Sequence, residues 1–397
     1  MMADVVDLQA WKARIQSGRN GPKKSVTNLL LHLQNIKELG NTIRWNELAQ
    51  QAEWNSHPIE DSHLIDIRLI LEHNGFEPPL EALLPTIVRH AKDNAFHPVR
   101  DYLRALKWDG TRRLDYWLEQ CLGSPKSQFN RLVGRKTLIA AVARAFRPGC
   151  KVDTVLVLEG PQGIRKSSAI AALFGEDWTA ESVDLFGQHN KMVMNMMGAW
   201  VVELAEFIAI TKRDQNHVKG LLSMRTDKVV LPYAKIASAH PRQCVFFGTI
   251  NPGETGYLTD TTGNRRYWPV EVVRADLEKI KARRDQLWAE AYKAFCDDER
   301  WWLEEDEQGL AEAEVATREE DDVWDEILGK KLDDEMVKTV TAAAALQAIG
   351  VPNERMDKRA LNRVGACLRR LGYEPKPRKM DVEGEKKTVK LFIKSER

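Results

Sequence analysis

Several features that would place the chain in a familiar class are scarce or missing. Its 397 residues include five cysteines, and no two of them form a Cys-x-x-Cys pair, so neither a disulfide framework nor a zinc ribbon is expected. Its nine histidines form no His-Glu-x-x-His motif, and we therefore predict no protein-bound zinc. Widely spaced, reduced thiols favour a cytoplasmic protein.

Long hydrophobic runs are also missing. The longest apolar stretches fall far short of the roughly 20 residues that a membrane-spanning helix needs. The segment Met1–Arg14 mixes Asp4, Asp7 and Lys12 with apolar residues, and it has neither the apolar region nor the cleavage site of a signal peptide. We expect no membrane partner.

An overall excess of charge is missing, but charge is concentrated locally. The formal net charge is +1, which by itself indicates no nucleic-acid partner. Asp297–Asp325 holds 14 acidic and 2 basic residues, whereas Thr341–Arg397 holds 14 basic and 7 acidic residues. This asymmetry favours an acidic helical connector followed by a small basic module, although two solvated surfaces of opposite charge explain it too.

Three short apolar runs are present and predict buried strands. They are Thr154–Leu158, Ala199–Leu204 and Cys244–Ile250, and stretches with helical character separate them. Such alternation is typical of a parallel sheet covered by helices. The predicted fold class is therefore α/β.

A glycine-rich stretch, Gly160–Ser168, follows the first of these strands and precedes a helical segment. It is close to the pattern Gly-x-x-x-x-Gly-Lys-Ser/Thr, whose backbone N–H groups and helix N-terminus hold phosphates. Lys166 would neutralise the phosphates of ATP, and Ser167 would ligate Mg²⁺. The alternative is an ordinary strand–turn–helix with a chance match. The residues predicted to contact ATP are Gly160, Pro161, Gln162, Gly163, Ile164, Arg165, Lys166, Ser167 and Ser168.

One position departs from this pattern, because Arg165 stands where the motif has a glycine before the lysine. If the backbone there needs a conformation that favours glycine, Arg165 is strained and nucleotide affinity falls. If it needs only ordinary dihedral angles, the side chain points outward without cost. Both possibilities stay open at this point.

Polar residues follow the second and third strands. Glu203 is expected near the metal and Glu206 near the attacking water, while Asn251 is expected to hydrogen-bond the γ-phosphate or that water. Two solvated acids past a strand end are the alternative. Arg265 and Arg266 are adjacent further on. One of them acts as an arginine finger toward a neighbouring subunit, or both stack structurally on the aromatic residues beside them.

Two further segments carry basic residues that point to DNA. Between the second and third strands, Lys228, Lys235 and His240 interrupt an alternating stretch that predicts a hairpin, either touching a phosphate backbone or lying at an ordinary edge. At the C-terminus, a helix, a second helix over Lys358–Leu371 and a hairpin over Lys376–Lys394 predict a winged helix-turn-helix. The DNA-binding residues expected in this module are Lys358, Arg359, Arg363, Arg369, Arg370, Lys386 and Lys387.

These patterns divide the chain into five parts. A mobile segment is expected at 1–24, a helical N-terminal domain at 25–146 and an ATPase core at 147–296. An acidic helical connector at 297–340 and the winged-helix-like module at 341–397 complete the chain.

The order of motifs resembles the virulence-associated E family of phage, prophage and satellite replication proteins, a branch of superfamily 3 helicases within the AAA+ P-loop ATPases. The resemblance covers roughly residues 26–274. The strings that carry it are His97–Leu103, Leu106–Leu114, Leu158–Gly163, Trp200–Glu206, Pro232–Tyr233, Gly248–Asn251 and Asp260–Pro269.

The resemblance implies a homo-oligomeric ring, expected to be a hexamer in the cytoplasm of a bacterial host, with ATP between subunits. Lys166, Ser167, Glu203, Glu206 and Asn251 would act in one subunit, and Arg265 or Arg266 would act from its neighbour. The segment around Lys235 would track single-stranded DNA in the central pore. Relatives fused to a primase imply a separate primase or host replication factor as partner.

Three functions remain open at this stage. The first is an ATP-dependent DNA helicase of a mobile element, with double-stranded DNA bound by the C-terminal module. The second is a nucleotide-binding initiator or scaffold that hydrolyses ATP weakly because of Arg165. The third, a small-molecule phosphotransferase, fits the downstream arginine pair and the basic module poorly.

Overall fold

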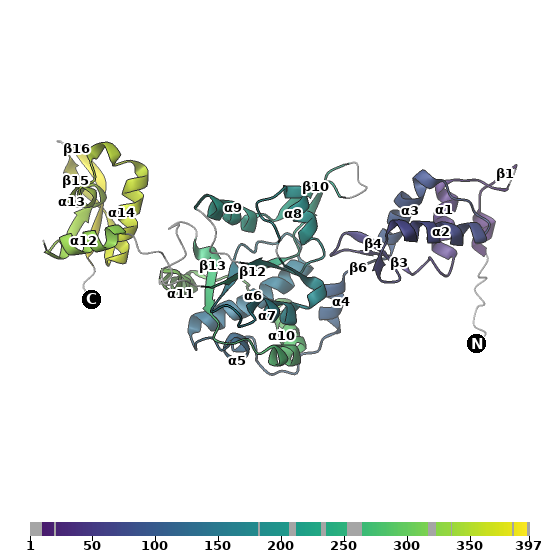
Figure 1. Ribbon diagram of the computed structural model, residues 1–397, viewed down its shortest axis with the longest axis horizontal. Coiled ribbons are helices and arrows are strands. Elements are labelled where there is room, and N and C mark those ends of the chain that lie inside the picture. Colours follow the sequence, from purple (N-terminus) through teal and green to yellow (C-terminus); the bar gives the residue numbers. More distant parts are fainter. Residues whose placement is uncertain are drawn as a thin grey trace.

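The computed structural model describes residues 10–19, 21–181, 183–205, 212–231, 236–251, 264–316, 323–334, 336–382 and 385–394. Figure 1 shows an N-terminal unit, a central unit and a C-terminal unit one after another along the long axis. Within the described residues, no helix is both long and apolar enough to cross a membrane.

A five-stranded sheet forms the middle of the central unit. Its strands are β7 (Val155–Glu159), β8 (Thr179–Ala180), β9 (Val201–Ala205), β12 (Val245–Ile250) and β13 (Tyr267–Glu271). They run in the order β13-β7-β12-β9-β8, and every neighbouring pair is parallel. The predicted parallel sheet is therefore confirmed, with β8 and β13 added to the three strands expected from sequence.

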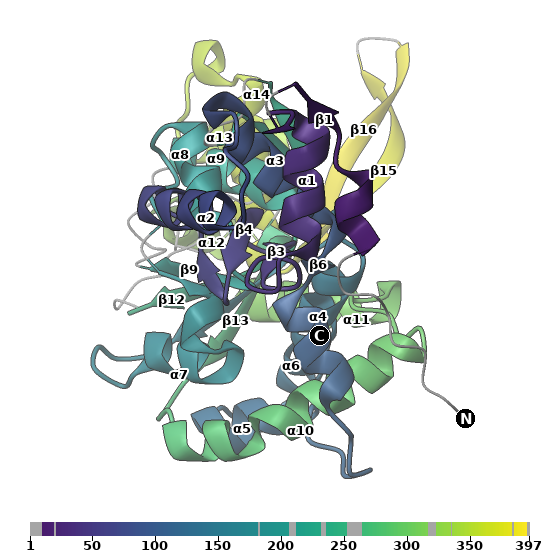
Figure 2. The ribbon, with the colours of Figure 1, turned by 90° about the vertical axis from the view of Figure 1, so that its right-hand side faces the viewer.

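Helices cover both faces of this sheet, because successive side chains of each strand point to opposite sides. Leu156 and Leu158 of β7 pack in one core with the helices α6 (Gln128–Phe146), α7 (Lys166–Phe174) and α10 (Leu277–Cys296). Val155 and Val157 pack in a second core, with α8 (His189–Met196) and α9 (Lys212–Ser223) on the other face. Figure 2 shows α6, α7 and α10 on one side of the strands and α8 and α9 on the other.

The remaining elements of the central unit connect this framework. They are α4 (Pro98–Ala105), α5 (Trp117–Leu122), η2 (Glu176–Trp178), α8 (His189–Met196), α9 (Lys212–Ser223), β10 (Thr226–Val229), β11 (Ser238–Pro241), η3 (Asn264–Arg266) and α11 (Glu305–Ala316). The strands β10 and β11 form the hairpin expected between the second and third predicted strands.

The N-terminal unit is less helical than the sequence indicated. Its elements are η1 (Ala10–Arg14), β1 (Ser17–Gly18), β2 (Gly21–Pro22), α1 (Val26–Asn35), β3 (Ile43–Asn46), β4 (Gln51–Trp54), β5 (His57–Pro58), α2 (Asp61–His73), α3 (Leu80–Asp93) and β6 (Ala95–Phe96). Four of the strands form a sheet in the order β5-β4-β3-β6. These strands have two to four residues each and mix polar with apolar side chains, so they give no clear period-two signal.

The packing also differs from the division expected at residue 146. The apolar side chains of α4, α5 and α6 lie in the core of the central unit, whereas the separate core of the N-terminal unit runs from Leu29 to Ala91. The N-terminal unit therefore ends near β6, about 50 residues before the expected boundary.

The expected acidic connector is likewise divided between two units. Ala311 and Val315 of α11 pack in the cores of the central unit. Leu328 and Leu332 belong to α12 (Val323–Asp334) and are buried in the core of the C-terminal unit. The rest of that unit comprises β14 (Thr339–Thr341), α13 (Ala342–Ala348), η4 (Asn353–Arg355), α14 (Lys358–Arg370), β15 (Tyr373–Val382) and β16 (Glu385–Lys394). The two helices and the hairpin expected there are present, and β14 joins the hairpin as a third strand.

Candidate functional site

The glycine-rich loop runs from the end of β7 to the start of α7. A Cβ atom on Gly160 would lie 2.5 Å from the carbonyl oxygen of Val272 and 2.6 Å from Cδ1 of Ile164, so only glycine fits there. Gly163 has a φ of +87°, which also favours glycine. Pro161, Gln162, Gly163 and Arg165 are exposed, and the loop is therefore accessible from solvent.

Arg165 occupies the N-cap position of α7 in the left-handed conformation, with φ 66° and ψ 38°. A residue with a Cβ atom pays about 1–2 kcal/mol for this conformation relative to ordinary backbone. The sequence left open whether the backbone at Arg165 is in ordinary or in glycine-favouring geometry, and the structure shows the glycine-favouring geometry. The Arg165 side chain is exposed and makes no capping hydrogen bond, so the first-turn N–H groups of α7 stay available to an anion.

Lys166 turns back over the loop that precedes it. Its Nζ donates hydrogen bonds to the carbonyl oxygens of Gly160 and Pro161, at 2.7 and 2.9 Å, and to Oδ1 of Asn251, at 2.8 Å. Burial lowers the pKa of Lys166, while the nearby Glu203 carboxylate opposes this shift. A polyanion at the loop would replace the carbonyl dipoles with full negative charges and favour the ammonium form.

The half-buried Ser167 and the buried Glu203 and Thr249 form a polar cluster beside Lys166. The Ser167 and Thr249 hydroxyls each donate to Oε1 of Glu203 at 2.6 Å. The sheet order explains the contact, because β12 lies between β7 and β9 and brings Thr249 against the Glu203 strand. Thr249 was not among the predicted site residues; its sequence signal was only its place near the end of a buried strand.

The donor set of this cluster fits Mg²⁺. Mg²⁺ prefers oxygen ligands and is held by one or two carboxylates or hydroxyls together with substrate phosphates. Ser167 Oγ and Glu203 Oε1 provide such oxygens at the start of α7. In the part of the chain that the structure describes, no group of three or more His, Cys, Asp or Glu side chains could hold a metal ion.

The two arginines of η3 differ in their surroundings. Arg266 donates to Oγ of Ser223 at 3.2 Å, and its Nε lies 3.9 Å from Oδ2 of Asp153. Arg265 is exposed at the surface. Within this chain, Arg266 therefore takes part in internal contacts, whereas the Arg265 side chain is exposed to solvent.

The hairpin residues expected at DNA do not share one face. Paired residues of an antiparallel ribbon point to the same side, and successive residues alternate. Because His240 pairs with Asp227 and Lys228 pairs with Ala239, Lys228 and His240 point to opposite sides. Glu206 and Lys235 lie outside the described residues.

Two basic residues of the C-terminal unit take part in internal contacts. The Arg363 guanidinium lies over the Trp324 ring, 3.9 Å from its centroid, and Arg370 makes a two-point ion pair with Asp325 at 2.7 and 3.0 Å. Both contacts join α14 to α12. Arg369 is exposed. The other expected DNA-binding residues lie on α14 (Lys358, Arg359) and on β16 (Lys386, Lys387).

The fold and the site define an α/β protein with a glycine-rich strand-to-helix loop at the carboxyl edge of a parallel sheet. A family model described as the virulence-associated protein E-like domain matches residues 103–320. This match covers more than half of the chain, and the protein belongs to that family. The matched range coincides closely with the central unit, through α11.

Solved structures that align with most of the chain were also found. The apo structure of the NrS-1 C-terminal region is 13% identical, with a TM-score of 0.49 over 89% of this chain and 96% of that chain. An A-form apo structure of the same region is 12% identical, with a TM-score of 0.45 over 94% and 100% of the two chains. No curated protein matches the sequence.

Proposed function

We propose that the protein is an ATP-dependent DNA helicase or translocase that works in the replication of a phage or related mobile element. The observation that carries the proposal is the meeting of Lys166, Asn251 and the Ser167–Glu203 pair at one edge of the sheet. Membership in the virulence-associated protein E-like family supports the replication role.

The residues divide the chemistry among them. The first-turn N–H groups of α7 and the Lys166 ammonium would bind the β- and γ-phosphates, displacing the loop carbonyls that Lys166 now contacts. Ser167 and Glu203 would hold Mg²⁺, which neutralises charge on the phosphates when bound. Asn251 would orient the γ-phosphate or the water, and Glu206 would accept the proton of that water.

The arrangement favours ATP bound between subunits. The Arg265 guanidinium is exposed and has the charge needed to stabilise the transition state of a neighbour's γ-phosphate. We therefore assign the finger role to Arg265 within a homo-oligomeric ring, a hexamer in the form we propose. Single-stranded DNA would contact the β10–β11 hairpin side, and double-stranded DNA would contact the C-terminal unit.

A matched pair of serines tests the site. Ser167→Ala removes the hydroxyl that contacts Glu203. Ser168→Ala removes an exposed hydroxyl on the same helical turn but keeps the backbone N–H through which Ser168 would contact ATP. We expect Ser167→Ala and Lys166→Ala to lower ATP turnover by about 10²-fold or more, and Ser168→Ala to change it less than about threefold. Unchanged turnover in Lys166→Ala would show that the loop around Lys166 is not the site of ATP hydrolysis.

A second candidate function rests on the strained Arg165 backbone. If this strain prevents the loop from closing on the phosphates, the protein would bind nucleotide and DNA but hydrolyse ATP slowly. It would then act as an initiator or scaffold that recruits a primase or host replication factors. Substantial basal hydrolysis by the purified protein distinguishes the first function from the second.

A further inference from the structure

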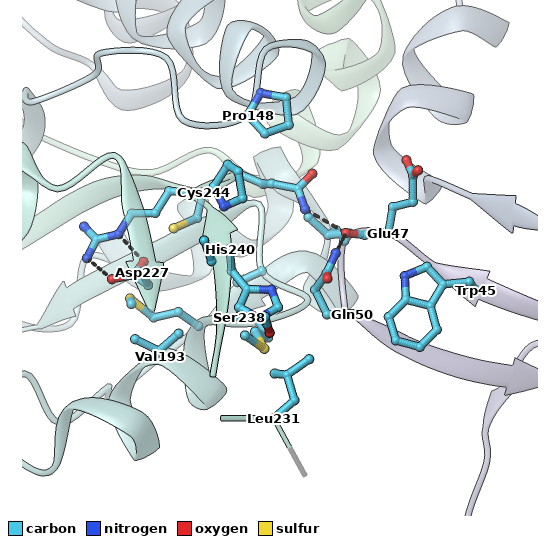
Figure 3. Close-up of a pocket in the computed structure, with 18 of the residues that line it drawn as sticks. Trp45, Glu47, Gln50, Pro148, Val193, Asp227, Leu231, Ser238, His240 and Cys244 are labelled. Atoms are coloured by element: carbon cyan, nitrogen blue, oxygen red, sulfur yellow. Dashed lines mark hydrogen bonds and ion pairs between the residues drawn. The ribbon is translucent and has the colours of Figure 1, made fainter. Parts of the chain in front are cut away.

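A cavity of about 490 Å³ lies where the N-terminal unit meets the central unit. Its volume falls within the roughly 300–1,000 Å³ range typical of small-ligand sites. One wall is formed by residues of β3 and the turn that follows it, and the other by the β10–β11 hairpin and α8. We call this cavity the junction pocket, and Figure 3 shows Trp45 and His240 entering it from these two sides.

The walls of the junction pocket are held together by specific contacts. Leu48 is buried in the core of the central unit, and its carbonyl accepts a hydrogen bond from the Gly198 N–H. The Glu47 carbonyl accepts from Nε2 of Gln243 at 2.7 Å, and the Glu47 carboxylate pairs with Arg100 at 2.9 Å. The two units are therefore fixed against each other at this site, and the cavity is part of the folded structure.

The polar groups of the pocket leave one positive charge unpaired. Arg242 makes a buried two-point pair with Asp227, at 2.6 and 2.8 Å, and Arg100 is paired with Glu47. Among the described residues that line the cavity, Lys92 is the cation without a carboxylate at ion-pair distance. Its Nζ lies 4.8 Å from the centre of the Trp45 ring.

The pocket thus combines a partly exposed aromatic ring, an adjacent unpaired cation and hydrogen-bonding groups on the opposite wall. Ser238 and His240 provide these groups and contact each other at 2.7 Å. A planar base stacks on an indole ring, and an ammonium beside it attracts a phosphate. A ligand with both an aromatic plane and a negative charge fits this set.

We propose that the junction pocket binds one nucleotide unit of a single-stranded nucleic acid, with the base on Trp45 and the phosphate at Lys92. The base would displace the Lys92 ammonium from the indole face, and the ammonium would move to the phosphate. This inference rests on the proposed function, because it names where a strand is held. The pocket also adjoins the residues that lead into β12, and the opposite end of β12 precedes Asn251. The bound nucleic acid and the bound ATP would therefore lie at opposite ends of β12.

Binding of a labelled dT20 oligonucleotide to the full chain tests the proposal. We expect Trp45→Leu to weaken binding about tenfold and Trp45→Tyr to retain most of it, because stacking needs an aromatic face. We expect Lys92→Gln to weaken binding severalfold and to reduce the slope of log K against log salt by about 0.7. Trp54→Leu and Lys37→Gln, in the same unit but outside the pocket, are matched controls that should bind normally.

Photocrosslinking with 5-iodouracil in the oligonucleotide gives the location directly. A crosslink in the peptide that contains Trp45 supports the proposal, whereas normal binding by Trp45→Leu and Lys92→Gln with crosslinks elsewhere overturns it. Equilibrium dialysis with dTMP distinguishes a free nucleotide from a nucleic-acid strand as the ligand of the pocket. Binding of dTMP that depends on Trp45, with oligonucleotide binding unaffected, would identify a free nucleotide instead of a strand.

The failure of this inference is distinguishable from failure of the ATPase assignment. Basal ATP turnover without DNA should be normal in Trp45→Leu, since Trp45 lies outside the loop that Lys166 contacts. If Lys166→Ala hydrolysed ATP normally while Trp45→Leu still lost the oligonucleotide, the P-loop assignment would fail and the junction pocket would stand.

Discussion

Arg165 is the residue at which the motif and the backbone disagree. The loop adopts the left-handed conformation that suits glycine, yet the chain places an arginine there. The conformation is already formed, so the strain is a cost to stability and not a block to loop geometry. The next residue, Lys166, is tied to the start of the loop by its hydrogen bond to the Gly160 carbonyl oxygen.

Two substitutions at this position separate backbone strain from side-chain effects. Arg165→Ala removes the guanidinium and keeps the strain, whereas Arg165→Gly removes both. We expect the free energy of unfolding of Arg165→Gly to exceed that of Arg165→Ala by about 1 kcal/mol in denaturant titrations. ATP turnover should stay within about threefold of wild type in both. A tenfold gain in Arg165→Gly alone would instead favour the weakly hydrolysing scaffold.

The exposure of Arg265 leads to a mixing prediction. Arg265→Ala and Lys166→Ala should each abolish turnover, but a random one-to-one mixture should recover about a quarter of wild-type turnover if the finger acts between subunits. In such a ring, an intact P-loop meets an intact finger at about one interface in four. A mixture without activity would place the arginine at the site of its own subunit, whereas normal turnover in Arg265→Ala alone would place it outside the reaction. Arg266→Ala should lower the thermal midpoint, because Arg266 contacts Ser223 and lies near Asp153.

The proximity of the site residues could be predicted from sequence where they follow the ends of parallel strands. The carboxyl ends of parallel strands meet at one edge of a sheet, so sequence order alone indicated that Lys166, Glu203 and Asn251 would lie close together. Thr249 was missed because a threonine inside a buried run has no distinguishing pattern. The internal contacts of Arg266 were not predictable either, since they depend on Asp153 and Ser223, which are distant in sequence.

At the scale of elements, His97 fixes the start of α4. Its Nδ1 accepts from the Arg100 N–H, and its Nε2–H donates to Oε1 of Gln243 at 2.7 Å. Burial is the main cause that lowers the pKa of His97, from 6.5 to about 4. Between about pH 6.5 and pH 4, the His97 ring therefore stays neutral in the folded state, whereas it takes up a proton in the unfolded chain. The free energy of unfolding consequently falls as the pH drops through this range.

The pH dependence of unfolding isolates this histidine. His97→Asn keeps a side chain that caps a helix and removes the titrating group. Between pH 7.5 and pH 5, the loss of unfolding free energy should be about 2 kcal/mol smaller in His97→Asn than in wild type, measured by denaturant titration at both pH values. The other histidines cancel in this comparison. Equal losses in the two proteins would show that His97 is not held neutral by the fold.

Element prediction succeeded where apolar runs were long or strongly patterned. The helix α14, for example, lies within one residue of the expected range Lys358–Leu371. The N-terminal strands β3 and β4 were missed, because each has four residues and carries charged or amide side chains that face solvent or pair locally. Their formation depends on the tertiary core that runs from Leu29 to Ala91, which no local pattern reveals.

At the scale of the whole molecule, the buried cores define the units better than composition does. The acidic stretch looked like one connector because its charge is continuous along the sequence. Instead, α11 packs on the central unit, and α12 supplies Leu328 and Leu332 to the C-terminal core. Charge lies on the solvent side of these helices, so charge runs and domain boundaries are set by different constraints.

This division predicts where the chain can be cut. Among the described residues, Val315 is the last buried residue in the cores of the central unit, and Leu328 is the first buried residue in the core of the C-terminal unit. A fragment ending at Ala316 should therefore fold with a thermal midpoint close to that of the full chain, while a fragment ending at Asp334 would expose Leu328 and Leu332 and should aggregate.

The fragment ending at Ala316 should also keep basal ATP turnover and dT20 binding within about threefold of the full chain, and lose binding to a labelled duplex. Retained duplex binding by that fragment would move the duplex contact from the C-terminal unit to the central or N-terminal unit, because the basic α14 and β16 would then be dispensable for it.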